Sequence, residues 1–89
     1  SLMMWSLYIL KCADGTFYTG ISNDLSARIQ KHEQGQGAKY TKGRGPFKLV
    51  YSESFKDRAS ATRREAEIKK LKKPEKLKLV EGFKTTLDS

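Results

Sequence analysis

Two tyrosines in the segment LYILKCADGTFYTG, residues 7–20, are side chains that could share a chemical task. The strand formers around Tyr8 and Tyr18 predict two β-strands, and the Asp14-Gly15 dipeptide between them is typical of a hairpin turn. A phenol can both donate and accept a proton. The hairpin therefore either uses tyrosine as a good strand former or holds two phenols together for chemistry.

The length of the turn decides between these interpretations, because side chains alternate across a sheet. A two-residue turn would place Tyr8 opposite Ile21 and the two phenols on opposite faces. A three-residue turn over residues 13–15 would place Tyr8 opposite Gly20, with both phenols on one face and space beside the glycine. The sequence permits both registers, and only the second would build a two-tyrosine site.

An arginine and a histidine share one face of the next predicted element, a helix over about residues 24–33. The i, i+3, i+4, i+7 spacing of one helical face is followed by Leu25, Arg28, Ile29 and His32. A guanidinium is a rigid fork that suits phosphate, and an imidazole can relay a proton or donate to an oxyanion. In the alternative interpretation, which is equally open, Arg28 and His32 only reach solvent from the margins of the stripe.

A glutamate projects onto the apolar face of the second predicted helix, over about residues 59–73. At about 100° per residue, Ala61 and Ile68 define the inner face of this helix, and Glu65 lies between them in projection. A carboxylate in that position could ligate a hard cation such as Mg²⁺. The alternative is an ion pair with Lys69, worth only about 0.2–0.5 kcal/mol.

The segment GQGAKYTKGRGPFK, residues 35–48, combines glycines with cations around one tyrosine. Glycines let the backbone approach phosphates closely, cations neutralise them, and an aromatic ring can stack on a base. We therefore expect DNA or RNA contacts from Lys39, Tyr40, Lys42, Arg44 and Lys48. A flexible basic loop without a ligand is the alternative. The later run of lysines between residues 69 and 78 is more typical of a solvated helical face.

The order of the predicted elements indicates an α+β fold. Strands are expected over about residues 5–12, 16–21 and 47–55, and helices over about 24–33, 59–73 and from Pro74 to Gly82. Asn23 or Ser22 is expected to cap the first helix. The order β-β-α-β-α-α predicts a small three-stranded antiparallel sheet flanked by helices.

Length and composition limit the function classes. The 89 residues suit one domain, over residues 5–83, with an added lead-in at 1–4 and a tail at 84–89. A formal charge of +8 favours a polyanionic partner, with nucleic acid ahead of an anionic membrane. No stretch is apolar enough to span a membrane. The single cysteine, Cys12, and the lack of a signal-like segment favour a reducing cytoplasm.

These residues, taken in order, resemble the GIY-YIG nuclease family, and most of all its short, stand-alone bacterial members. The resemblance covers about residues 5–80 and rests on SLYIL, YTG ten residues later, an arginine ten residues after Tyr18, and TRREAEIKKLKK. It implies a three-stranded antiparallel sheet flanked by helices. It also implies cleavage of phosphodiester bonds in DNA with one divalent metal ion.

The resemblance also implies a role for each site residue. Glu65 would hold Mg²⁺ or Mn²⁺. Tyr18 would be the general base toward the attacking water, and Tyr8 would position the water or the base. Arg28 would bind the scissile phosphate and stabilise developing charge, while His32 would assist proton transfer. All four residues Tyr8, Tyr18, Arg28 and Glu65 should then converge on one surface pocket.

The sequence departs from the family pattern in places. The first triplet reads Ser6-Leu7-Tyr8, the second has Thr19 at its centre, and no asparagine follows Glu65. We therefore predict a divalent-metal-dependent DNA endonuclease, structure-directed or nonspecific. A nucleic-acid-binding module with little or no catalysis is the alternative. The expected substrate is DNA, branched or single-stranded, with RNA left open, and a protein partner could supply target specificity.

Overall fold

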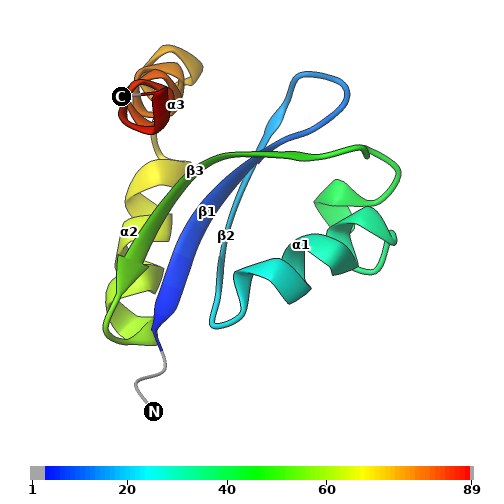
Figure 1. Cartoon of the computed structure of the whole chain (residues 1–89), viewed down its shortest axis with the longest axis horizontal. Coiled ribbons are helices and arrows are strands. Elements are labelled where there is room, and N and C mark those ends of the chain that lie inside the picture. Colours follow the sequence, from blue (N-terminus) through cyan, green and yellow to red (C-terminus); the bar gives the residue numbers. More distant parts are fainter. Residues whose placement is uncertain (1–3, 89) are drawn as a thin grey trace.

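A computed structural model describes residues 4–88, with side chains described up to residue 83; the greater part of the expected lead-in lies outside this range. The elements are β1 (Trp5–Lys11), β2 (Phe17–Ser22), α1 (Leu25–Glu33), the 3₁₀ helix η1 (Lys39–Thr41), β3 (Lys48–Phe55), α2 (Arg58–Lys69) and α3 (Lys73–Asp88). The predicted α+β fold and its element order are confirmed (Figure 1).

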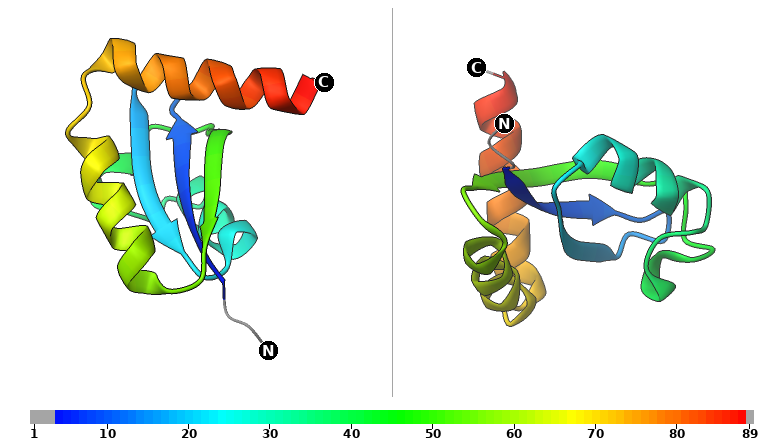
Figure 2. Two further views of the ribbon diagram at one scale, coloured as in Figure 1. Left: turned by 90° about the vertical axis from the view of Figure 1, so that its left-hand side faces the viewer. Right: turned by 90° about the horizontal axis from the view of Figure 1, so that it is seen from below.

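The sheet is antiparallel with the order β2-β1-β3, so β1 is central and β2 is an edge strand. Helices α2 and α3 lie on one side of the sheet and α1 on the other, and β2 passes between α2 and α1 (Figures 1 and 2). Leu7 and Ile9 of β1 point toward α2 and are fully buried against Ile68. Burial of these side chains from water fixes α2 on this face.

The hairpin has the three-residue turn. The Cys12 N–H donates to the Thr16 carbonyl at 2.8 Å, and the Gly15 N–H donates to the Cys12 carbonyl at 3.0 Å. Gly15 has φ of 85°, which a glycine adopts without strain. Tyr8 consequently lies opposite Gly20, as the odd turn predicts. The register that brings both phenols to one face is confirmed.

Three helix boundaries differ from the sequence prediction. The cap of α1 is Asp24, whose Oδ1 accepts the Ala27 N–H at 3.2 Å, and neither Asn23 nor Ser22 takes that role. Helix α2 ends at Lys69, before residue 73. Helix α3 continues through Gly82 to Asp88 and so includes most of the expected tail. A glycine ends a helix when it turns left-handed, and Gly82 does not have positive φ.

Candidate active site on the α1 face of the hairpin

Tyr8 and Tyr18 lie side by side on the sheet face that α1 covers. Their ring centroids are 6.2 Å apart, with Tyr8 fully buried and Tyr18 half-buried. A Cβ atom at Gly20 would lie 2.7 Å from the Tyr8 Oη and 2.9 Å from the Tyr18 Cε2. Only glycine at this position therefore lets both rings keep their places.

A chain of buried hydrogen bonds leads from Tyr8 to a histidine of α1 and on to a loop threonine. The Tyr8 Oη lies 2.9 Å from the His32 Nε2, and the His32 Nδ1 lies 2.8 Å from the Thr41 Oγ1. The Thr41 hydroxyl donates to the Ala38 carbonyl at 2.8 Å. His32 and Thr41 are each 1% exposed, so water does not compete for these bonds.

These contacts fix the tautomer of His32. The single hydroxyl proton of Thr41 is used toward Ala38, so Thr41 can only accept at the His32 Nδ1, which must carry a proton. Burial lowers the pKa of His32, and the positive charge of Arg28 lowers it further, so the ring is neutral. Its Nε2 is then an acceptor, and the Tyr8 hydroxyl donates to it.

The pKa of Tyr8 agrees with this assignment. Burial raises the pKa of Tyr8 to about 12, against an opposing effect of hydrogen bonding with Arg28. The phenol therefore keeps its proton at neutral pH. Tyr8 in the resting protein is a proton donor toward His32, and its oxygen lone pairs are left for other donors.

Arg28 extends from α1 toward both phenols. The Tyr8 hydroxyl nearby is the largest cause that raises the pKa of Arg28, and the Tyr18 hydroxyl adds to it. Arg28 is half-buried, and a cavity of about 250 Å³ opens beside it, lined also by Asn23 and Lys31. The sequence predicted that Arg28 and His32 share a helical face, and the structure brings both to the tyrosines.

Glu65 reaches this site from a different direction. Helix α2 covers the face opposite Tyr8 and Tyr18, so Glu65 meets them only across the edge strand β2. After burial and the charge of Tyr18, the negative charge of Glu65 is the smallest of the causes that raise the pKa of Tyr8. The Glu65 Oε2 lies 3.3 Å from the Lys69 Nζ, which is the ion pair that the sequence offered as the alternative.

The donor set around Glu65 suits a magnesium ion better than a zinc ion. Among the described residues, no group of three His, Cys, Asp or Glu side chains could hold a metal. Mg²⁺ commonly keeps several waters and binds through one or two carboxylates together with substrate phosphates. The partly buried Glu65 carboxylate fits that mode, because it needs no further protein ligand.

The predicted basic segment borders the site but its members differ in surroundings. Tyr40 is 44% exposed and stacks on Tyr18, with ring centroids 6.1 Å apart. Arg44 lies over the Tyr40 ring at 4.5 Å and forms an ion pair with Asp14 of the hairpin turn. The three lysines of the segment, Lys39, Lys42 and Lys48, are exposed to solvent and make no described ion pair.

Two residues of the site were missed by sequence reasoning. Thr41 was treated as part of a basic loop, and no spacing rule connects it to His32. The sequence predicts that the glycines of this loop let the backbone approach phosphates, but the structure gives Gly37 another role, because a Cβ there would overlap the His32 Nδ1 and lie 2.8 Å from two ring carbons. Phe47 completes the enclosure with its ring 6.0 Å from that of His32. The one sequence signal for such partners was the place of His32 on a partly apolar helical face, because a polar side chain that is buried there needs hydrogen-bond partners.

Comparison with known proteins shows the family to which this fold belongs. A family model described as the GIY-YIG catalytic domain matches residues 4–78. UPF0213 proteins of several Staphylococcus aureus strains are 50% identical over 74 residues, which is 83% of this chain and 90% of theirs. The chain belongs to the GIY-YIG family, within the group of small bacterial UPF0213 proteins.

Two solution NMR structures share the fold. A UPF0213 protein from Bacillus halodurans is 48% identical, with a TM-score of 0.59 over 89% of this chain and 84% of that one. A protein from E. faecalis is 34% identical, with a TM-score of 0.63 over 92% and 88% of the two chains. No helix among residues 4–88 is both long and apolar enough to cross a membrane.

Proposed function

We propose that the protein is a divalent-metal-dependent endonuclease that hydrolyses phosphodiester bonds in DNA. The observation that carries the proposal is a guanidinium, Arg28, beside two phenols, one of which donates to a histidine of fixed tautomer. Family membership supports a nucleic acid substrate. The formal charge of +8 agrees with a polyanionic substrate.

Arg28 would bind the scissile phosphate. Its fork can donate to two phosphate oxygens while its charge favours the negative charge that develops in the transition state. The raised pKa of Arg28 keeps that charge at all relevant pH values. The open cavity beside Arg28, lined also by Lys31, leaves room for the substrate backbone.

Tyr18, the more exposed phenol, would first give its own hydroxyl proton to solvent and then, as the phenolate, accept the proton of the attacking water, while Tyr8 would align that water with its free lone pairs. The new bond joins the water oxygen to phosphorus, the bond from phosphorus to the leaving sugar oxygen breaks, and that oxygen takes a proton from solvent. Tyr8 can pass its own proton to the His32 Nε2 as it accepts another. His32 would then be an imidazolium whose two N–H groups donate to Tyr8 and Thr41.

Glu65 would hold the metal ion, with the remaining positions filled by water and phosphate oxygens. A bound divalent cation polarises the phosphoryl oxygen and stabilises the leaving oxygen. Lys69 must then release Glu65, which is a small change because an i, i+4 ion pair on a helix contributes only about 0.2–0.5 kcal/mol.

The test compares Glu65→Ala with Glu67→Ala, a matched loss of one carboxylate from the same helix. Glu67 is exposed and pairs with Arg64. Plasmid, branched DNA, single-stranded DNA and RNA are incubated with Mg²⁺ or Mn²⁺ and with chelator. We expect cleavage by the wild type and by Glu67→Ala, and none by Glu65→Ala or in chelator.

Cleavage that persists in Glu65→Ala would overturn the mechanism. Tight, salt-sensitive binding without any cleavage would favour the nucleic-acid-binding module instead.

A further inference from the structure

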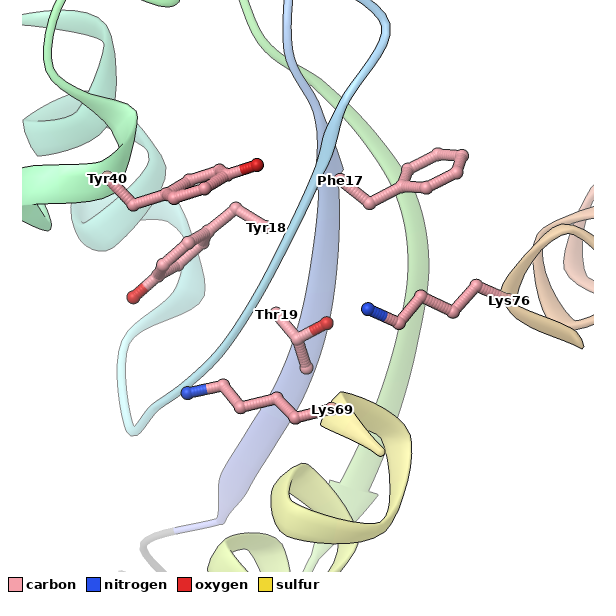
Figure 3. A pocket seen from close by; sticks show the side chains of 6 residues that line it. All are labelled: Phe17, Tyr18, Thr19, Tyr40, Lys69 and Lys76. Carbon is pink, nitrogen blue, oxygen red and sulfur yellow. The ribbon is translucent and has the colours of Figure 1, made fainter. Parts of the chain in front are cut away.

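A cavity of about 330 Å³ lies along the edge strand β2, and Tyr18 forms part of its wall. Figure 3 shows Tyr18 and Tyr40 on one side of the strand and Phe17 and Lys76 on the other, with Thr19 and Lys69 below. From the sequence, the lysines between residues 69 and 78 are more typical of a solvated helical face than of a binding site. The structure brings two of them, Lys69 of α2 and Lys76 of α3, to one cavity.

Lys76 carries a charge that no described residue neutralises. Lys69 pairs with Glu65, whereas no ion pair of Lys76 is found among the side chains described up to residue 83. In Figure 3 the Lys76 ammonium extends from α3 toward β2. Two lysine ammonium groups converge on this cavity, and only one of them, that of Lys69, is paired with a carboxylate, that of Glu65. The cavity therefore keeps a net positive charge, which a bound anion would neutralise.

Thr19 supplies a second, independent observation. This residue lines the cavity and is 4% exposed, and its hydroxyl is buried without a hydrogen-bond partner among the described residues. A buried hydroxyl without a partner is unfavourable by about 1–3 kcal/mol. A phosphate oxygen in the cavity would supply the acceptor that the protein lacks.

The cavity is also the start of a longer groove. A neighbouring cavity of about 210 Å³ shares Phe17, Tyr40 and Lys76 as walls and adds Thr16 and Lys73. The two cavities thus follow β2 from Thr19 toward the hairpin turn. An elongated groove with a lysine in each part and an aromatic ring along its wall suits several linked nucleotides better than one small anion.

We propose that this groove, called here the β2-edge groove and lined by Phe17, Thr19, Tyr40, Lys69, Lys73 and Lys76, is a subsite for the phosphodiester backbone next to the scissile phosphate. Lys76 and Thr19 contact a phosphate, and the exposed part of the Tyr40 ring packs along the bound strand. The proposal rests on the proposed nuclease function, and it extends the contact surface from the predicted loop to the α2–α3 side of the sheet.

Binding measurements in chelator test the groove without any need for cleavage. Lys76→Ala is compared with Lys78→Ala, an equal loss of charge from α3 at an exposed position outside the groove. The Kd for a fluorescein-labelled DNA duplex and for its single strand is measured against salt concentration. For Lys76→Ala we expect the slope of log Kd against log salt to fall by about 0.7–0.9, as for one lost phosphate contact. Lys78→Ala should leave the slope unchanged. Equal slopes for the two variants would overturn the subsite.

A second variant separates ligand contact from folding. Thr19→Val has nearly the same shape and removes the unpartnered hydroxyl, so its thermal stability should equal or exceed that of the wild type. Its affinity for the labelled DNA should nevertheless fall. Unchanged affinity would remove Thr19 from the subsite. A Lys76→Ala effect on the salt slope in a protein that cleaves nothing would support the groove and count against the proposed nuclease function.

Discussion

The two sides of strand β2 are built in opposite ways. On the α1 side, Tyr8, His32 and Thr41 are at most 1% exposed and every polar atom in their chain has a partner. On the α2–α3 side, Lys69 is exposed, Lys76 lacks a described ion pair and the Thr19 hydroxyl lacks a described partner. The first side is preorganised, and the second has groups that a ligand could satisfy.

This difference indicates which task each side can perform. Proton transfer requires fixed hydrogen-bond geometry, and the enclosed chain from Tyr8 to Thr41 provides it. Recognition of a polyanion of variable sequence needs charge and stacking surface but little fixed geometry. We therefore expect substitutions on the α1 side to affect the reaction and, apart from the proposed metal-binding residue Glu65, substitutions on the other side to affect binding.

The largest effect is expected from Gly20→Ala, because the new methyl group would displace the Tyr8 Oη and the Tyr18 ring. A misplacement of about 1 Å can reduce a rate about a hundredfold, and cleavage should fall by at least that factor. Gly82→Ala is the control, because its methyl group would meet no atom of the described residues within 4 Å. Single-turnover cleavage and thermal melts of both variants are the measurement. Full activity of Gly20→Ala would show that the close contact has no catalytic role.

A smaller effect is expected from Thr41→Val, which keeps the shape of the side chain but removes the acceptor for the His32 Nδ1–H. The tautomer would no longer be fixed, and cleavage should fall by about tenfold or more. Thr41→Ser should retain activity. The ¹⁵N chemical shifts of the imidazole ring report the tautomer directly. An unchanged Nδ1–H tautomer in Thr41→Val would contradict the positioning role, whatever its stability.

A pH dependence of stability should follow from the neutral, enclosed state of His32. Its pKa is lowered in the folded protein, so below about pH 6.5 the unfolded chain binds more protons than the folded one. Stability is then fully present above about pH 6.5 and falls on acidification. His32 is the single histidine of the chain, so His32→Gln should flatten this dependence between about pH 7 and pH 5. The measurement is the melting temperature of the wild type and of His32→Gln across that pH range. A wild-type melting temperature that does not depend on pH would contradict the neutral state of His32.

The smallest effect is expected from Lys69→Met on the open side. Its ion pair with Glu65 joins a largely exposed ammonium to a carboxylate four residues away, and such a pair contributes about 0.2–0.5 kcal/mol. The melting temperature should fall by less than about 4 °C. Lys70→Met, at the C-cap of the same helix and without a described ion pair, is the control. A much larger fall would mean that the α2 side is as preorganised as the α1 side.

Periodicity and turn chemistry were sufficient for the elements of this fold and for much of the site. The helical spacing that joins Arg28 to His32 is a local property that the sequence predicts, and the odd hairpin turn that pairs Tyr8 with Gly20 is one of the two registers that the sequence permits. Helix ends were less predictable, because Gly82 could have ended α3 only in a left-handed conformation, which its sequence context does not determine.

The contacts that lay beyond prediction join segments whose separation follows no period. Thr41 meets His32 through the path of an irregular loop, and Gly37 matters for the space that it leaves and not for its φ angle. Lys76 reaches the edge of β2 because α2 ends at Lys69 and α3 starts in a new direction. Such contacts depend on tertiary packing, which spacing along the sequence does not encode.

The three-residue hairpin turn also has an evolutionary consequence. Because side chains alternate with a period of two, the turn between β1 and β2 can gain or lose residues in pairs and keep Tyr8 and Tyr18 on one face. A single-residue insertion or deletion would reverse one strand and separate the phenols, unless a bulge restored the register. Selection on this hairpin should therefore act on the parity of its length more strongly than on the identity of its turn residues.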